Sequence, residues 1–506
     1  MAVRRFKATK DNTITNAYKA NLTTRGTGSN MGASDIVEVF SIYGQASTSS
    51  SELSRILIDF DINAINSARD AKNIPASGSV DFYLRMFNAD HSSTTPTNFT
   101  LTVAAVSQSW TEGIGLDMED YSDADPSGSN WINSSYQTVW TTFHGNVQGG
   151  SFHTGSAAVT SSQFFQNGTE DIELNITRHV EEWINGNTGS YGFGVFLSSS
   201  LETADTSYYT KKFFARDSQY FLKRPVIEAR WNDSRFDDSS NFYLSSSRVP
   251  AADNLNTLYL YNYVRGQLQD IPGLGAENKI YLSIYTGSNS VPSGDKITLP
   301  VGGGVVANND YNVTGSKVAI GIYSASFAYT SSGITEIYPV WHSSSVDPPV
   351  PTIEYLTASS ITVNTFDTQT PYPINSYKAN ITNLQSQYGS SDVVNFRVFV
   401  QNKNFLATVY TVASTAVQPT IMEKMYYKVS RVVDEEIVIN YGTGSGDAGY
   451  TQLSYDSAGN YFDLDMSIFE PDFSYQISFM INDAGKYTEL KDKFKFRIID
   501  ENDLPG

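Results

Sequence analysis

The sequence predicts an all-β fold of tandem β-sandwich domains, and three observations lead to this prediction. Aromatic residues make up 13% of the 506 residues, with 32 Tyr, 28 Phe and 6 Trp, and they favour pleated, half-buried surfaces. Only 17% of the residues are charged, which is low for a chain with long surface helices. Short apolar or alternating segments, separated by stretches rich in Asn, Gly and Ser, recur along the whole chain, as expected for strands joined by turns.

Residues 1–232 are predicted to form a jelly-roll-like domain. Residues 55–61 and 99–106 are examples of its apolar strand segments, and residues 225–231 supply the last strand. One short helix is expected at residues 171–183, because apolar side chains recur there at helical spacing after a possible N-cap, Asn175.

Two further β domains are predicted after the first. Residues 233–346 begin with a polar linker and continue with four or more strands, a pattern typical of an immunoglobulin-like sandwich. Residues 347–351 (DPPVP) form a stiff Pro-rich linker. Residues 352–506 are expected to form a third β-sandwich, with a hairpin turn at residues 482–485.

Two similar segments raise the question of whether the first and third domains are related. Residues 16–23 (NAYKANLT) resemble residues 375–382 (NSYKANIT). Shared ancestry predicts that Tyr18 and Tyr377 occupy equivalent strands. Chance similarity in a biased composition is the alternative.

The charge balance and the residue types exclude several classes of partner. The formal net charge is −19, with 34 Lys and Arg against 53 Asp and Glu, so the chain as a whole repels a phosphate backbone. The chain has no Cys, which excludes disulfides and thiolate metal sites. The sequence has no run of 18 apolar residues, so no membrane-spanning helix is predicted. The basic residues Arg4, Arg5, Lys7 and Lys10 either contact an acidic partner or form a solvated terminus.

No pattern in the sequence predicts catalysis. The five His residues lack the spacing of a metal site, and no nucleophile elbow or phosphate-binding loop is present. We therefore predict that the protein is not an enzyme and has no catalytic residues. No cofactor is expected apart from the calcium considered next.

The densest acidic segment is the loop 117–125, between Trp110 and Trp131. It can be a solvated loop, a structural calcium site, a contact for a sugar or partner, or a carboxylate pair for catalysis. It lacks the central Gly and distal Glu of an EF-hand loop. The candidate calcium ligands are Asp117, Glu119, Asp120, Asp123 and Asp125.

Aromatic residues in the polar stretch that follows are the candidates for glycan or partner contact. Trp131, Tyr136 and Trp140 are expected to be exposed there. The remaining patterned Trp residues are expected in the core, and these are Trp110, Trp183 and Trp231.

The first domain resembles the DNRLRE-type β-sandwich family. The matching pieces occur in the family's order, and they include residues 54–61 (SRILIDFD), 111–113 (TEG), 172–186 and 224–231 (RPVIEARW). The resemblance implies a jelly roll related in shape to carbohydrate-binding modules. Unlike the surface-anchored bacterial members, this sequence has no signal peptide and no cell-wall anchor.

A second, narrower resemblance covers most of the chain. Residues 207–231, beginning SYYTKKFFAR, together with residues 461–466 (YFDLDM) and 494–497 (FKFR), are similar to virion structural proteins of large marine tailed phages, such as those infecting cyanobacteria. This resemblance implies a virion protein assembled in the host cytoplasm, present in several copies. Its expected partners are other virion proteins at the neck, tail or capsid surface. A host-glycan-binding adhesin or fibre protein is the alternative.

Overall fold

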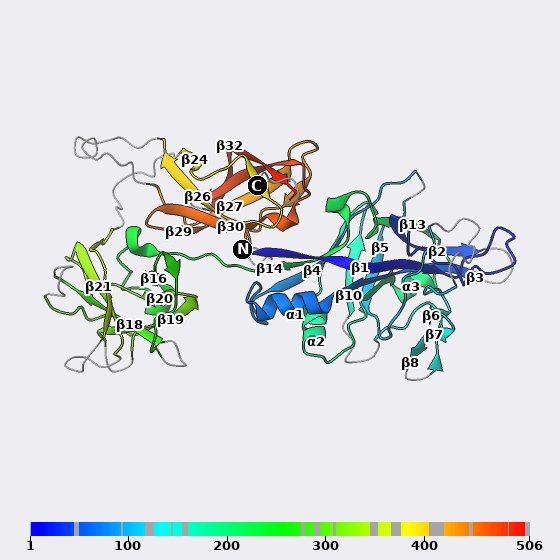
Figure 1. Cartoon of the computed structure of the whole chain (residues 1–506), viewed down its shortest axis with the longest axis horizontal. Coiled ribbons are helices and arrows are strands. Elements are labelled where there is room, and N and C mark those ends of the chain that lie inside the picture. Colours follow the sequence, from blue (N-terminus) through cyan, green and yellow to red (C-terminus); the bar gives the residue numbers. More distant parts are fainter. Residues whose placement is uncertain are drawn as a thin grey trace.

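The computed structural model is almost entirely β, in three domains that follow one another along the chain (Figure 1). It describes residues 2–44, 50–92, 95–116, 126–142, 145–153, 160–274, 279–287, 294–306, 310–344, 353–365, 376–403, 419–444, 449–483 and 485–500. The predicted fold class, tandem β-sandwiches, is confirmed. Within the described ranges, no helix has the length and apolar character needed to cross a membrane.

The first domain is built on one curled, ten-stranded antiparallel sheet, with two separate two-stranded hairpins and short helices around it. Its strands are β1 (Val3–Thr15), β2 (Ile36–Gly44), β3 (Ser50–Phe60), β4 (Asp81–Met86), β5 (Phe99–Ala105), β6 (Asn133–Ser135), β7 (Thr138–Val139), β8 (Thr141–Thr142), β9 (Gly145–Asn146), β10 (Thr160–Phe165), β11 (Ile172–Asn175), β12 (Phe193–Leu197), β13 (Tyr208–Phe214) and β14 (Val226–Arg230). Its helices are α1 (Ile62–Asp70), α2 (Thr177–Ile184), α3 (Ser199–Glu202) and the 3-10 turn η2 (Phe221–Lys223).

Strand β1 organises this sheet because its two halves have different neighbours. Its first half pairs with β14, and after a bulge between Ala8 and Lys10 its second half pairs with β3. The full strand order is β10-β5-β12-β3-β1-β14-β4-β11, with β2 joining β3 to β13. The end strands β10 and β11 meet through side chains: Gln163 donates to Asp171 O at 2.7 Å and accepts from Glu173 N at 3.0 Å, and Ser161 Oγ donates to Asn175 O at 3.4 Å. These contacts curl the sheet around its apolar core.

The helix predicted at 171–183 is shorter than expected. Its first part is strand β11, which pairs in antiparallel register with β4, and α2 begins only at Thr177. Pairing with β4 satisfies backbone groups that a longer helix would have used internally. The N-cap of α2 is Ile176 and not the predicted Asn175, whose side chain accepts from Thr177 N at 3.0 Å from one position earlier.

The middle domain is a seven-stranded antiparallel sheet in the order β15-β20-β19-β18-β21-β22, with β23 also on β21. Its elements are η3 (Asp238–Ser240), η4 (Ala251–Asp253), β15 (Asn256–Tyr261), β16 (Tyr263–Val264), β17 (Gln267–Leu268), β18 (Lys279–Tyr285), β19 (Asn312–Ala319), β20 (Ile322–Phe327), β21 (Glu336–His342), β22 (Glu354–Thr357) and β23 (Ile361–Thr362). The small β16–β17 hairpin stands apart from the main sheet.

The middle domain extends beyond its predicted C-terminal boundary, because later strands pair with its sheet. The linker predicted at 347–351 lies outside the described residues, but β22 and β23, which follow it, pair with β21. Ile361 and Val363 are buried in the middle domain's apolar cluster. The domain therefore extends to about residue 364, where Asn364 bridges back to Tyr243, and the predicted division at residue 352 places these strands on the wrong side.

The third domain is a sandwich of two sheets, in the orders β24-β26-β30-β29 and β25-β32-β31-β27-β28. Its elements are β24 (Tyr377–Ile381), β25 (Gln387–Gly389), β26 (Val393–Asn402), β27 (Met425–Arg431), β28 (Ile437–Ile439), β29 (Ser454–Asp456), β30 (Gly459–Asp465), η5 (Met466–Ile468), β31 (Ser474–Asp483) and β32 (Lys486–Ile499). The predicted hairpin turn at 482–485 is confirmed, because Asp483 pairs with Lys486.

The sequence similarity between the first and third domains does not correspond to equivalent strands at its first segment. Tyr18 lies beyond the end of β1, in a loop where it forms an isolated bridge with Arg25. Tyr377 begins β24 and pairs with Asn402 of β26. The expected equivalence of the two Tyr residues is therefore wrong, and chance similarity remains as its explanation.

Candidate functional site at the interdomain joints

Both ends of the first domain's chain meet the third domain at one joint. β1 begins there, and β14 ends there with Arg230 opposite Val3 in antiparallel register. Ala2, Val3 and Leu222 are buried in the same apolar cluster as the core of the third domain. The two domains therefore share buried apolar surface, and the first residues of the chain are part of the contact.

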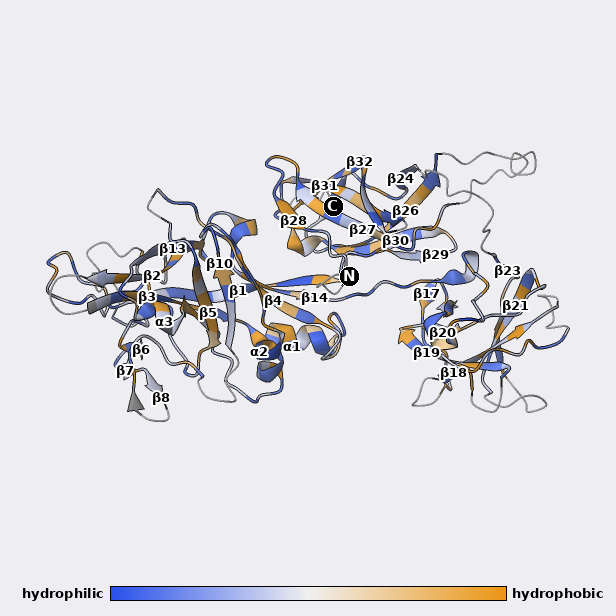
Figure 2. Cartoon of the chain, turned by 180° about the vertical axis from the view of Figure 1, so that it is seen from behind, coloured by the Kyte–Doolittle hydropathy of each residue, from blue (hydrophilic) through white to orange (hydrophobic). Residues whose placement is uncertain are grey.

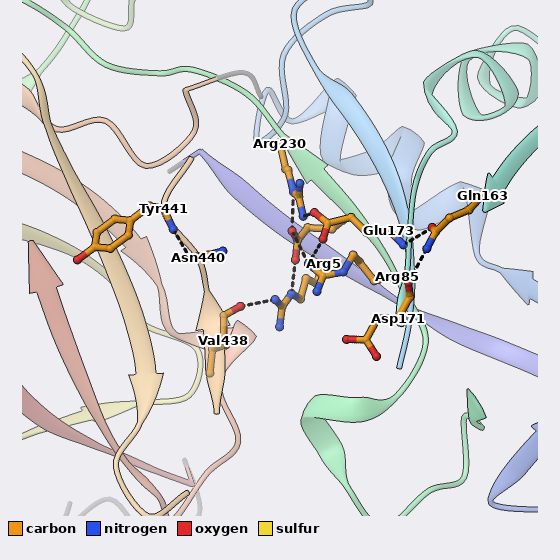
Figure 3. Close-up of polar contacts among 10 residues, drawn as sticks. Arg5, Arg85, Gln163, Asp171, Glu173, Arg230, Val438, Asn440 and Tyr441 are labelled. Carbon is orange, nitrogen blue, oxygen red and sulfur yellow. Dashed lines mark hydrogen bonds and ion pairs between the residues drawn. The ribbon is translucent and has the colours of Figure 1, made fainter. Parts of the chain in front are cut away.

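An ion cluster centred on Glu228 of β14 lies at this joint. Figure 3 labels its members Arg5, Arg85, Glu173 and Arg230. Arg5 Nε donates to Glu228 Oε2 at 2.7 Å, and Arg230 Nε donates to Oε1 at 2.7 Å. A nitrogen of Arg85 lies 3.8 Å from the same carboxylate, and Arg230 also donates to Glu173 at 2.6 Å. The cluster thus gathers side chains from β1, β4, β11 and β14 around one carboxylate.

Glu228 is charged because three guanidinium groups overcome the cost of burying it. The residue is 3% exposed, and burial alone would raise its pKa. Arg5, Arg230 and Arg85 outweigh that effect and hold the pKa of Glu228 at about 2. Removing one partner from a buried pair is more damaging than replacing both, because the remaining charge stays uncompensated. Substitution of a single residue of the cluster is therefore expected to lower the stability of the protein strongly.

Three contacts connect the cluster and its surroundings to the third domain. Arg5 Nη2 donates to Val438 O of β28 at 2.5 Å. The Lys223 ammonium lies 2.8 Å from the Glu436 carboxylate. The Arg230 guanidinium lies 4.9 Å from the centre of the Tyr450 ring, within the range of a cation–π interaction.

The polar linker predicted at the start of residues 233–346 lies along the third domain. Phe236 forms a parallel bridge with Tyr455 of β29, supported by hydrogen bonds from Asp237 N to Tyr455 O (3.1 Å) and from Tyr455 N to Arg235 O (2.9 Å). The Tyr455 hydroxyl donates to Asp238 at 2.7 Å. Burial raises the pKa of Asp237 to about 6. At this second joint, the linker that leads to the middle domain is held against the third domain by backbone pairing.

A groove of about 990 Å³ lies beside the first joint, between the first and third domains. Its walls include the aromatic side chains of Tyr220 and Phe473. Arg431 lies over the Phe473 ring at 4.7 Å and forms ion pairs with Asp434 and Glu470, both at 2.5 Å. The Arg431 cation is thus paired with two carboxylates that line the groove.

The predicted exposure of two of the three contact aromatics is wrong. Trp131 is 4% exposed and Trp140 is fully buried, whereas Tyr136 is 59% exposed. The two indoles form a second apolar cluster with Trp110, outside the main core of the domain. The Trp140 indole donates to Asn130 O at 2.8 Å, so the polar stretch supplies the hydrogen-bond partner that the buried ring needs.

The Trp residues predicted in the core are buried as expected. Trp110 and Trp183 are each 5% exposed, and Trp231 is 4% exposed. Their segments showed an apolar pattern, which the stretch containing Trp131 and Trp140 lacks.

The predicted calcium ligands lie outside the described residues. These are Asp117, Glu119, Asp120, Asp123 and Asp125, and the calcium site stays a prediction. In the part of the chain that is described, no group of three or more His, Asp or Glu is arranged to hold a metal ion.

Strand β14 carries a signal in the sequence that points to the ion cluster. Every residue of β14 (VIEAR) is buried, and Glu228 stands between Ile227 and Ala229. A carboxylate within a short apolar strand requires a buried cation, because such charges are almost never buried unpaired. The basic residues near the N-terminus were candidates for this cation, and Arg5 is one of the three arginine partners of Glu228, with Arg85 and Arg230.

Comparison with known proteins adds little to this description. No protein-family model matches the chain, and no curated protein matches it. Among solved structures, the chain is similar to the N-terminal Ig1-2 module of the Drosophila receptor protein tyrosine phosphatase DLAR. That similarity has 8% identity, covers 49% of this chain and 90% of that module, and has a TM-score of 0.13, so it carries no argument about function.

Proposed function

We propose that the chain is a structural subunit of a tailed-phage virion, assembled in the host cytoplasm and docking on neighbouring virion proteins at the neck, tail or capsid surface. The observation that carries this proposal is the way the domains are joined. Shared buried apolar surface, the Arg5 hydrogen bond to Val438 O, the Lys223–Glu436 ion pair and backbone pairing of the linker connect them where a flexible tether would suffice for independent binding modules. A fixed arrangement of the domains suits a virion subunit whose neighbouring subunits occupy defined positions.

Exposed apolar side chains on the middle domain support a role among neighbours. These solvent-exposed residues of the middle domain include Val301, Val318, Ile320, Ile353 and Leu356. Their exposed fractions run from 40% to 70%. Apolar side chains of this kind become buried when subunits assemble.

The test is to locate the chain on a particle. Virions that encode it are purified, their proteins are identified by mass spectrometry, and the three-domain structure is fitted into a cryo-electron microscopy map. We expect several copies at a symmetric position. Absence of the chain from intact, infectious particles overturns the proposal.

Host-glycan binding is the second candidate, and exposed Tyr136 favours it. This residue lies in the turn between β6 and β7, where an aromatic ring can stack on a sugar. The full chain and Tyr136→Ala would be compared on arrays of host polysaccharides, and binding lost in the variant supports this function. Release of reducing sugar during the assay would overturn the proposed absence of enzymatic activity.

A further inference from the structure

Strand β32 presents a row of positive charges on its outer side. Lys491, Lys493, Lys495 and Arg497 are exposed, whereas Phe496 and Ile498, which alternate with them, are buried. Alternate residues of a strand point to the same face at intervals of roughly 6.6 Å, so Lys493, Lys495 and Arg497 span about 13 Å. Lys491 precedes them across a register shift in the β31–β32 pairing. We call these four residues the β32 ladder.

The ladder is not neutralised by the strand beside it. Its cross-strand neighbours on β31 are Gln476 opposite Lys495 and two Ser residues, Ser478 opposite Lys493 and Ser474 opposite Arg497. Arg497 forms one exposed ion pair, 3.2 Å from Asp472. The three Lys residues form no ion pair with any carboxylate in the described part of the chain. Four neighbouring cations with one carboxylate partner leave a strong local positive potential.

The ladder lies on a side of the third domain that the other domains do not cover. In both views β32 is at the margin of this domain opposite the linker and the N-terminus (Figures 1 and 2). A groove of about 640 Å³ beside β32 is lined by Lys378, Lys403 and Lys486, and an equal number of acidic residues balances these three charges. Acidic residues of the same groove are Asp483, Glu489 and Asp492, and Glu489 lies 3.3 Å from Lys428.

We propose that the β32 ladder docks an acidic face of a second copy of this chain. The whole chain has a net charge of −19, so the rest carries −23 once these four positive charges are set aside. Another copy is therefore a predominantly acidic surface for the ladder. Charges more than about 8 Å apart are largely screened at physiological salt, so local complementarity outweighs the repulsion between the two net charges.

The inference deepens the proposed function, because it names another copy as one of the neighbours, but the two can fail separately. A chain that is absent from virions can still self-associate through the ladder. Conversely, a virion subunit that stays monomeric in solution contradicts only the ladder. The particle map and the solution experiment therefore have independent outcomes.

The test is sedimentation velocity of the full chain over a concentration series at low and high NaCl. We expect self-association that weakens as salt rises. The triple variant Lys491→Glu, Lys493→Glu, Lys495→Glu should associate at least roughly tenfold more weakly, since three surface ion pairs together approach one factor of ten in affinity. The matched control is Lys72→Glu, Arg248→Glu, Arg265→Glu, which makes the same change in net charge at exposed residues of other domains and should associate as the unmodified chain does.

Three results overturn the proposal. They are a chain that is monomeric at every concentration and salt, a control variant that loses as much affinity as the ladder variant, and binding of a labelled single-stranded DNA that depends on the ladder. The last result would assign the ladder to a phosphate backbone. If the ladder variant does not fold, zero-length carboxyl–amine cross-linking of mixed isotope-labelled and unlabelled chains decides: ladder Lys residues joined to carboxylates of the other copy support the proposal, and their absence from intermolecular links contradicts it.

Discussion

Strands β1 and β32 are the two longest among the described residues, and both are rich in basic residues, but their charges have opposite surroundings. On β1, Arg5 faces Glu228 and Lys10 lies 2.9 Å from Asp59. On β32, the cations face Ser and Gln. Basic residues therefore form ion pairs within the domain on β1, and they form an exposed, positively charged surface on β32.

The difference lies in the residue opposite each cation. Arg5 and Glu228 are direct partners in the β1–β14 register, so a buried carboxylate fixes the arginine. Lys495 has only Gln476 opposite. The residue opposite a cation on the neighbouring strand therefore indicates whether that cation stabilises the domain or is left for a partner. Variants of both strands test this interpretation.

The largest effect is expected from Glu228→Gln, which keeps the shape of the side chain and removes its charge. Arg5, Arg85 and Arg230 would then face one another with only half-exposed Glu173 as counter-charge. Removing one partner from a buried ionic group costs about 3–5 kcal/mol. We expect the free energy of unfolding to fall by that amount in urea denaturation, with the first and third domains affected together.

Glu173→Gln is the matched control for this variant. Its side chain is 47% exposed, so solvent screens its charge and the loss should stay below about 1 kcal/mol. Equal losses in the two variants would contradict the view that burial of Glu228 makes the cluster sensitive.

The next effect is the pH dependence of the same carboxylate. Because the pKa of Glu228 is lowered from 4.5 to about 2, its stabilisation is complete above about pH 4.5 and is lost as the pH falls through about 2. The difference in the free energy of unfolding between the unmodified chain and Glu228→Gln should therefore shrink by about 3 kcal/mol over that interval. Denaturation series at several pH values measure it, and a difference that stays constant down to pH 2 would refute the ionic role.

A smaller effect is expected from Arg5→Lys, because a lysine cannot bridge two acceptors as a guanidinium does. Arg5 reaches both Glu228 and Val438 O, and lysine keeps one contact at most. We expect a loss of about 1–2 kcal/mol and faster amide hydrogen exchange in β28. Arg4→Lys is the control, since Arg4 contacts the Phe6 ring at 5.9 Å. Unchanged exchange in β28 would show that Arg5 does not hold the third domain.

The sequence was sufficient for the type of most elements because alternation and turn residues are local properties. It was insufficient for their partners. Arg5 and Glu228 are 223 positions apart, and the sequence alone predicted the basic N-terminus only as a solvated end or a contact for another molecule. The domain division failed for a similar reason, because β22 and β23 return to β21 across the Pro-rich segment.

The aromatic site was mispredicted because burial depends on what folds over a residue. Trp131 and Trp140 lie in a polar stretch, and polar surroundings suggested exposure. In the structure, this stretch covers the side of β1 and β3 that carries Ile14 and Leu57, which gives the indoles an apolar surface to pack on. Tyr136 lies at a turn, where no element covers it, and its exposure could be predicted.

The smallest effect is expected from Lys495→Gln on β32. Its neighbours Lys493 and Arg497 have the same charge, and Gln476 opposite gains no ionic contact from it. Neutralisation should therefore change the free energy of unfolding by less than about 0.5 kcal/mol, and it should be neutral or slightly stabilising because it relieves like-charge repulsion. Urea denaturation at low salt measures it. A loss above about 1 kcal/mol would mean that Lys495 is anchored within the domain as Arg5 is, which would remove both the contrast between the two strands and the reason to assign β32 to a partner.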